Sequence, residues 1–261
     1  MSDCIEGSNP SLSAKGTRNG SLFIAIEMRN TGPFKFKQFS INHHESPMAL
    51  GTDAVMLGAW ANLPQNGQIL DIGTGCGIIA LMCAQRSKQG LITGIDISEE
   101  AIKEAKINGD KSPWTDRLSW ECQRLQDFKT ESLDYIICNP PFYERTGLQS
   151  PHMARSNARH TNELELVEIL AFAYMHLNHQ GLLGFVLPID INDTLIKDAQ
   201  DHGFELLRLL EIYPSLNKKA NRMLIEFGKA QRDIEQNEIV IRNADGSYTA
   251  EYIELTADFY L

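Results

Sequence analysis

Apolar runs and amphipathic stretches alternate along the chain from about Gln68 onward. Short apolar runs predict buried strands, whereas apolar residues that recur every three or four positions predict helices. The predicted strands are Ile69–Ile72, Leu91–Asp96, Arg117–Cys122, Leu133–Cys138, Gly181–Leu187, Glu205–Ile212 and Arg222–Lys229. The predicted helices are Gly77–Arg86, a helix capped by Ser98, Glu163–Leu177, Ile191–Gln200 and a final helix near Tyr252–Phe259.

The order of these elements predicts the fold class. Strands and helices alternate over the first four to five units, which is typical of a doubly wound α/β fold with a mostly parallel sheet. The strands Glu205–Ile212 and Arg222–Lys229 follow each other without a long helix, so we expect one of them to be antiparallel. The prediction is therefore a seven-stranded, mostly parallel sheet with one antiparallel strand. Ligands of such sheets bind at the carboxyl ends of the strands.

The first thirty residues differ from the rest of the chain. Ser, Gly, Asn and Thr dominate there without an apolar period, so residues 1–30 are predicted to be a poorly ordered tail. Residues 31–261 are expected to form one domain. Within it we expect a cap segment at 31–66, a core at 67–230 and a C-terminal extension at 231–261. Organised sequence begins just after Met28, so Met1 and Met28 are both candidates for the native start.

Composition narrows the class of protein. The chain has 261 residues, of which 43% are hydrophobic, and this is enough for one large α/β domain. Its formal net charge of -10 argues against non-specific nucleic-acid binding, so any RNA contact must come from local basic clusters. Five cysteines without a CxxC pair indicate reduced thiols of a cytoplasmic protein. No apolar run approaches the ~18–20 residues of a membrane span, and no spaced set of metal ligands predicts a metal site.

A glycine-rich turn, Asp71–Gly77, follows the first predicted strand. Its glycines at 73, 75 and 77 would let the backbone approach a ligand closely, where a Cβ would block it. A plain strand-to-helix turn is the alternative. The dinucleotide pattern GxGxxG would need a third glycine at position 78, which is Ile78. A nicotinamide-dependent oxidoreductase is therefore disfavoured.

Asp96 closes the next predicted strand. A carboxylate at this place can accept hydrogen bonds from both ribose hydroxyls of an adenosine. The alternative is a solvated helix cap that competes with Ser98. Because Asp96 stands at a strand end like the glycine turn, the two features point to one nucleotide-like cofactor.

The sequence Asn139-Pro140-Pro141-Phe142 follows the fourth predicted strand. Methyl transfer from a sulfonium needs alignment more than acid–base help, but an amine on an aromatic ring has a delocalised lone pair. Two acceptors on its N–H groups, such as the Asn139 side-chain oxygen and the Pro140 carbonyl, can draw that nitrogen toward sp³ geometry. The prolines stiffen the turn, and Phe142 offers a face on which a base can stack. An ordinary Asn-Pro loop is the alternative.

Asp71–Gly77 resembles the first motif of the class I S-adenosylmethionine-dependent methyltransferases, which have a Rossmann-like fold. The resemblance implies that this turn passes under the methionine and ribose of the cofactor, that Asp96 holds the ribose, and that Ile97 packs on the adenine. The adenine amine would be contacted near Arg124, with Gln126 or Asp127 as alternatives. The candidate cofactor residues are Asp71, Gly73, Thr74, Gly75, Gly77, Asp96, Ile97, Thr52, Asp53 and Asn139.

The loop at Asn139 resembles that of amino-methyltransferases acting on adenine N6, guanine N2 or protein glutamine. Several segments resemble the bacterial tRNA(Val) adenine-37 N6-methyltransferase family, and the resemblance covers roughly Phe34–Leu261. They are Phe34–Phe39, Gly51–Trp60, Ile239–Arg242, Tyr248–Tyr252 and Leu255–Leu261. This resemblance implies a cytoplasmic enzyme that methylates an adenine beside the anticodon of a valine tRNA. We expect it to be a monomer or a weak homodimer. Thr52 and Asp53 would then border the methionine end of the cofactor, with a helix N-cap as an equal alternative.

Other functions stay open at this point. A guanine N2 methyltransferase acting on rRNA or a protein-glutamine methyltransferase would use the same loop. The glutamine enzymes carry a separate N-terminal helical domain, for which the organised sequence before Asp71 is too short. A non-catalytic cofactor-binding or RNA-chaperone module would not need the intact Asn139–Phe142 sequence.

An RNA substrate requires local positive charge. The first candidates for phosphate contacts are Lys35, Lys37, Arg145, Arg155, Arg159 and His160. A second group is Lys218, Lys219 and Arg222. The group between 145 and 160 is favoured because it directly follows the target-base loop. Each of these residues taken alone is more simply a solvated surface charge.

Overall fold

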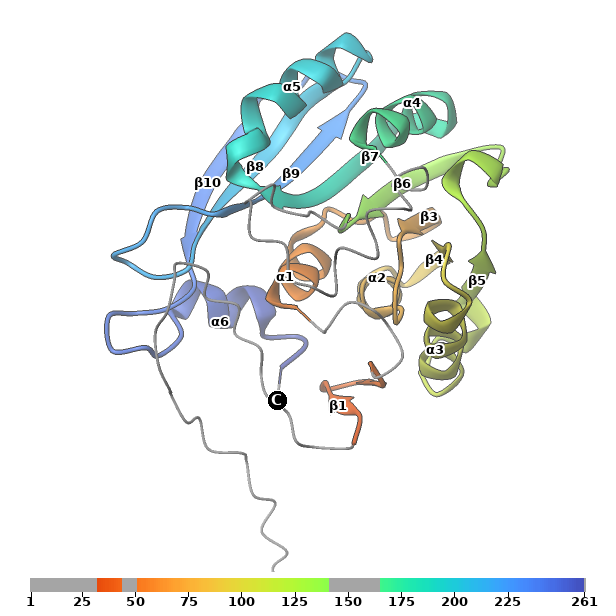
Figure 1. Ribbon diagram of the computed structural model, residues 1–261, viewed down its shortest axis with the longest axis horizontal. Coiled ribbons are helices and arrows are strands. Elements are labelled where there is room, and N and C mark those ends of the chain that lie inside the picture. The colour runs from red at the N-terminus through yellow and green to blue at the C-terminus, as the bar shows by residue number, and fades with distance from the viewer. Residues whose placement is uncertain (1–31, 44–50, 141–164, 261) are drawn as a thin grey trace, which may run out of the picture. The chain divides into compact units, whose positions relative to one another are not determined.

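The computed structural model describes residues 32–43, 51–140 and 165–260. The predicted tail, the question of the start at Met1 or Met28, and residues 141–164 lie outside the described residues. Residues Pro33–Leu261 form one compact unit around an eight-stranded sheet (Figure 1). The strand order is β10-β8-β9-β7-β6-β3-β4-β5.

The predicted strands are confirmed, with small shifts at their ends. The strands are β3 (Asn66–Ile72), β4 (Gln89–Asp96), β5 (Leu118–Cys122), β6 (Leu133–Cys138), β7 (Leu177–Pro188), β8 (Glu205–Tyr213), β9 (Arg222–Gly228) and β10 (Glu235–Val240). Strand β9 runs antiparallel to both β7 and β8, as expected for a strand that follows another without a helix. The described sheet has eight strands rather than seven, because β10 adds a parallel strand beside β8.

Helices cover both faces of the sheet (Figure 1). They are α1 (Thr52–Trp60), α2 (Ile78–Arg86), α3 (Glu99–Asp110), α4 (Leu166–His176), α5 (Asn192–Asp201) and α6 (Ala250–Thr256). On one face α1 and α2 pack in a core with Ile69, Tyr135 and Leu224. On the other face α4 and α5 pack in a core with Leu70, Ile136 and other residues of the opposite pleat. Successive residues of each central strand are buried on opposite faces of the sheet. Because helices cover both faces, the apolar run of such a strand is continuous.

The ends of the described unit lie together. Strands β1 (Phe34–Lys35) and β2 (Ser40–Ile41) form a short antiparallel pair, and the Phe36 ring stacks on Tyr260 at 5.8 Å. The Lys37 amide donates to the Phe259 carbonyl at 2.8 Å. The first organised segment is therefore held by the last one.

Two further observations concern the described residues. Cys76, Cys83, Cys122 and Cys138 are all free thiols, and only Cys122 of these is exposed. Within the ranges described, no helix is both long enough and apolar enough to cross a membrane.

Candidate functional site

Three neighbouring parallel strands end at one level of the sheet. Ile72 of β3 pairs with Cys138 of β6 on one side and with Ile95 of β4 on the other. The residues that come next are Gly73, Asn139 and Asp96. Because adjacent strands lie ~4.8 Å apart, the glycine turn, the Asn-Pro sequence and the ribose candidate lie together at the carboxyl edge, where sheets of this type bind ligands; we call this place the crevice.

The glycine turn is fixed by a buried acid beneath it. Asp71 is fully buried, and its Oδ2 accepts hydrogen bonds from the Thr74 hydroxyl at 2.6 Å and the Ala80 amide at 3.1 Å. Its Oδ1 finds no hydrogen-bond partner among the described residues. Burial raises the pKa of Asp71 to about 7, although the bonds from Thr74 and Ala80 lower it.

The glycines of the turn serve different purposes. Gly73, Gly75 and Gly77 all have positive φ, at 68°, 55° and 85°, so side chains here would strain the backbone. A Cβ on Gly77 would come within 2.8 Å of the Trp120 ring, which shows that this glycine is needed for packing. Among the residues that the structure describes, a Cβ on Gly73 would meet nothing within 4 Å, and Gly73 is exposed. The backbone at Gly73 therefore borders open space into which a ligand can fit.

Asp96 connects the end of β4 to the turn after β3. Its Oδ2 accepts from the Gly75 amide at 3.0 Å, and its Oδ1 accepts from the Ser98 amide at 2.9 Å. The cap of α3 is Ser98, whose Oγ accepts from Ala101, so the interpretation of Asp96 as a competing cap is wrong. Each carboxylate oxygen keeps a lone pair for a further donor, and Ile97 beside it is 62% exposed.

The Asn-Pro sequence begins at this edge. Asn139 is half-buried and Pro140 is buried directly after β6. Pro141 and Phe142 lie outside the described residues, so their predicted stacking and stiffening roles stay predictions.

Thr52 and Asp53 begin α1. Thr52 is exposed, and Asp53 accepts a hydrogen bond from Arg222 Nε at 3.0 Å in an ion pair. Gly51 occupies the N-cap position without a side-chain hydrogen bond, so the prediction that Thr52 or Asp53 caps the helix is wrong. Arg222 pairs with Pro188 at the carboxyl end of β7, which places Asp53 at the same edge as Asn139.

The alternatives for the adenine contact lie after β5. Arg124 and Asp127 form an exposed ion pair at 3.2 Å. The Gln126 amide donates to Glu168 at 2.8 Å. All three follow β5, whose last residue Cys122 pairs with Asp96, so the structure leaves them near the expected position without choosing between them.

The RNA-contact candidates are only partly described. Lys35 is exposed, and Lys37 donates from Nζ to the Ala257 carbonyl at the end of α6, at 2.6 Å. Their role in RNA binding stays a prediction. Arg145, Arg155, Arg159 and His160 lie outside the described residues.

Sequence reasoning missed Asn108 on α3. Its side chain is 1% exposed and donates to the Cys76 carbonyl at 2.8 Å and to the Asn42 carbonyl at 2.9 Å. The side-chain oxygen of Asn108 accepts from the backbone amide of Asn42 at 2.9 Å. Asn108 thus connects the glycine turn to the N-terminal segment. The available signal was a polar residue at helical spacing from Ala101 and Ala105, on the face of α3 that is buried.

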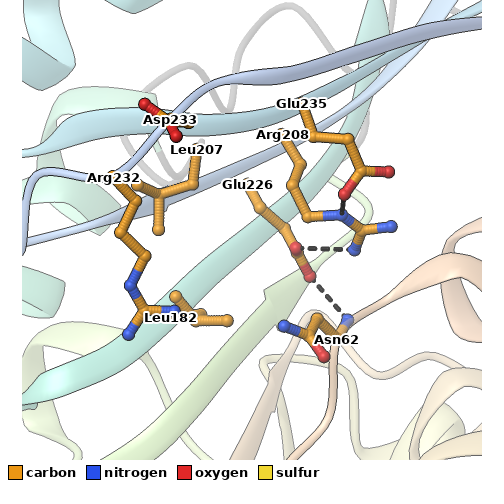
Figure 2. Close-up of a pocket in the computed structure, with 8 residues that line it drawn as sticks. All are labelled: Asn62, Leu182, Leu207, Arg208, Glu226, Arg232, Asp233 and Glu235. Carbon is orange, nitrogen blue, oxygen red and sulfur yellow. Dashed lines mark hydrogen bonds and ion pairs between the residues drawn. The ribbon is translucent and has the colours of Figure 1, made fainter.

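A separate polar cluster surrounds Glu226 (Figure 2). Glu226 is fully buried and accepts from the backbone amide of Asn62 at 2.7 Å, from the Arg208 guanidinium at 2.8 Å and from the Tyr135 hydroxyl. It borders a hollow of about 190 Å³ that is also lined by Leu182, which pairs with Tyr135 three residues before β6 ends. The remaining residues around the hollow are Leu207, Arg232, Asp233 and Glu235. This hollow is therefore distinct from the crevice at Gly73.

The acceptor groups and the exposed backbone at the crevice fit an adenosine-containing cofactor with a positively charged end. Asp96 offers two carboxylate oxygens for ribose hydroxyls, and Gly73 leaves backbone exposed beside them. The unpartnered Asp71 oxygen adds acceptor capacity beneath the turn. Within the described ranges, no three His, Cys, Asp or Glu side chains come together as a metal site.

Comparison with known proteins agrees with this geometry. Residues 51–188 match the methyltransferase small domain family. A Vibrio campbellii protein named tRNA1(Val) (adenine(37)-N6)-methyltransferase is 43% identical over 237 residues, covering 90% of this chain and 98% of that protein. A protein of the same name from Vibrio parahaemolyticus is 41% identical over 88% of this chain and 96% of its own length. A solved structure described as a predicted O-methyltransferase from Agrobacterium tumefaciens matches 79% of this chain and 96% of its own, with a TM-score of 0.62; at 16% identity it supports the fold alone.

Proposed function

The chain belongs to the tRNA1(Val) (adenine(37)-N6)-methyltransferase family of class I methyltransferases, and we propose that it methylates N6 of an adenine in tRNA with S-adenosylmethionine as the donor. The observation that carries this proposal is the strand register that puts Gly73, Asn139 and Asp96 at one edge. The adenine next to the anticodon of a valine tRNA is the proposed target. The enzyme would meet this tRNA in the cytoplasm.

The residues of the crevice suit binding of the donor. S-adenosylmethionine, when bound, supplies an electrophilic methyl group on a sulfonium. The Asp96 carboxylate would accept both ribose hydroxyls, since its two existing bonds to Gly75 and Ser98 hold it at the strand end. Ile97 would cover one face of the adenine with its exposed side chain. The exposed backbone at Gly73 would run beneath the remainder of the molecule.

Asn139 and Pro140 suit the acceptor amine. The Asn139 side-chain oxygen and the Pro140 carbonyl would each accept one N–H of the adenine amine, which orients its lone pair. Asn139 leaves the sheet beside Gly73, so amine and donor would meet across a single strand spacing. Alignment of the two reactants is the main contribution the protein can make to such a transfer. Phe142 would stack on the base.

The alternatives acting on guanine N2 or protein glutamine are not favoured. They share the Asn139 chemistry, but relatives that cover 88–90% of this chain bear the tRNA adenine name.

The decisive experiment is mass spectrometry of nucleosides from single tRNA species, purified from cells with and without the gene. We expect N6-methyladenosine to disappear from a valine tRNA and to return when the gene is restored. Restoration with the Asn139→Ala variant should fail. Unchanged N6-methyladenosine in every tRNA species, together with loss of a methylated guanosine or glutamine elsewhere, would overturn the proposal.

A further inference from the structure

The carboxyl edge of the sheet continues beyond the crevice to two loops on β8 and β10. We propose that these loops, residues 214–221 and 241–249, form a docking rim that binds the tRNA backbone and an unstacked base away from the target adenine. The proposal rests on the proposed function, because it assigns a contact surface to the same RNA substrate. We call this surface the β8–β10 rim.

The sheet places the rim in line with Asn139. Strand β8 is parallel to β10, and both end where Tyr213 pairs with Val240. The Ile241 amide donates to the Tyr213 carbonyl at 2.9 Å, so the two loops leave the sheet side by side, as the left side of Figure 1 shows. Four strand spacings separate β10 from β6, or ~19 Å. At ~3.4 Å per stacked nucleotide, the rim lies about five or six nucleotides from the target base.

The loop after β10 presents an arginine stacked on an exposed aromatic ring. Arg242 and Tyr248 face each other in an isolated β-bridge, and the guanidinium lies 4.2 Å from the centre of the Tyr248 ring. Tyr248 in turn stacks on Tyr252 at 4.8 Å, yet it stays 45% exposed. Arginine planes and aromatic rings are the groups on which unstacked RNA bases are held. The stack is therefore preformed and accessible.

Bonds within the loop hold this stack in place. Arg242 donates to the Gly246 carbonyl at 2.6 Å and to the Tyr248 hydroxyl at 3.0 Å. The nearby Asp245 carboxylate accepts from the Ser247 amide and hydroxyl, at 2.9 and 2.6 Å. The acid is thus engaged inside the loop, while the outer face of the arginine remains for a base or a phosphate.

The loop after β8 supplies positive charge beside the stack. Lys218 and Lys219 are exposed and lie in the same loop as Leu216, which is 60% exposed. Arg222 at the end of this loop binds Asp53 and so fixes the loop to the start of α1. In a chain with a net charge of -10, two adjacent lysines on the edge that carries Asn139 are a local site for phosphates.

Two sets of substitutions test the rim. In the first, Lys218→Ala with Lys219→Ala is compared with Lys88→Ala with Lys111→Ala, which removes two exposed lysines that precede β4 and follow α3 at the opposite edge. We expect the rim variant to lose roughly tenfold in kcat/KM for tRNA, mainly through KM, and the slope of log K against log salt to fall by about 2. Cofactor affinity should stay unchanged in both.

In the second set, Arg242→Lys keeps the charge and removes the planar group, and Arg242→Ala removes both. If the arginine holds a base, both variants should raise KM, with Arg242→Ala raising it more, while thermal unfolding shows that each variant is folded. An equal loss of tRNA affinity in the rim and control lysine variants would assign the effect to overall charge and overturn the rim proposal. The absence of any loss in both variants would overturn it too. Wild-type enzyme that methylates no tRNA would instead refute the proposed function, and the rim with it.

Discussion

The Asp96 carboxylate accepts a hydrogen bond from the backbone amide of Gly75, 3.0 Å away, so that the end of β4 holds the turn that follows β3. The bond joins two features that are 21 residues apart in the chain. One side chain thereby fixes the cofactor turn and is available to bind the cofactor itself. Loss of Asp96 should affect both roles.

We predict that Asp96→Ala weakens S-adenosylmethionine binding by ~2–4 kcal/mol, because two charge-assisted hydrogen bonds to the ribose would be lost. Isothermal titration calorimetry measures this directly. Asp110→Ala, at the exposed end of α3, removes the same charge away from the crevice and serves as the control. An unchanged dissociation constant for Asp96→Ala would exclude the ribose assignment.

Asn139→Ala should abolish methyl transfer while cofactor affinity changes less than about tenfold, because the side chain is expected to orient the acceptor rather than the donor. Transfer of radiolabelled methyl groups to tRNA, combined with calorimetry, separates the two effects. Asn66→Ala, at the exposed amino end of β3, is a matched control that should behave as wild type. Retained transfer by Asn139→Ala would refute the mechanism.

Asp71 should make stability depend on pH. Its pKa is raised by burial to about 7 in the folded protein, against 3.8 for the ordinary group. The folded state therefore favours the protonated acid, and this contribution is fully present below pH ~4 and lost as pH rises toward 7. The loss can reach ~4 kcal/mol, at ~1.4 kcal/mol for each pH unit between the two values.

The matching variant is Asp71→Asn, which cannot titrate. Denaturant unfolding at pH 4 and pH 7 should show that wild type loses more stability than Asp71→Asn over this interval. Parallel pH profiles for the two proteins would show that Asp71 does not titrate with a raised pKa.

Much of the fold was accessible from local pattern. Leu133–Cys138 was predicted to the residue, because a buried parallel strand reads as a continuous apolar run. The Ser98 cap was predicted from residue type and the acidic first turn that follows it. The glycine turn could also be placed, since its chemistry is local. Strand β10 was not recognised as part of the sheet, because four of its six residues are exposed and polar.

The remaining site contacts join residues far apart in the chain. The Asn42–Asn108 bonds span 66 residues and the Asp53–Arg222 pair spans 169. No periodic pattern in the sequence predicts such a pair, because each partner alone looks like an ordinary polar residue. Both contacts depend on the order of strands and helices in space, which the sequence pattern does not determine.

Asn108→Ala should lower the free energy of unfolding by about 2–4 kcal/mol, because it leaves the buried Cys76 carbonyl and the part-buried backbone groups of Asn42 without their partner. Cofactor binding should weaken as well, since the turn loses a support. Asn237→Ala removes an exposed amide on β10 and should change stability by less than ~0.5 kcal/mol. Equal stability of the two variants would show that the Asn108 bridge does not contribute.

Arg208 forms two ion pairs in the Glu226 cluster, one with a buried partner and one with an exposed partner. Arg208 binds the fully buried Glu226 at 2.8 Å and Glu235, whose side chain is 57% exposed, at 3.2 Å (Figure 2). Glu226→Ala should cost ~3–5 kcal/mol, because the Asn62 amide, the Tyr135 hydroxyl and the guanidinium all lose an acceptor. Glu235→Ala should cost less than ~1 kcal/mol, since water replaces its contact. Denaturant unfolding of both variants tests the difference, and methyl transfer at low denaturant should survive in each because the cluster lies away from the crevice. If Glu235→Ala proved as costly as Glu226→Ala, burial would not decide the strength of these pairs.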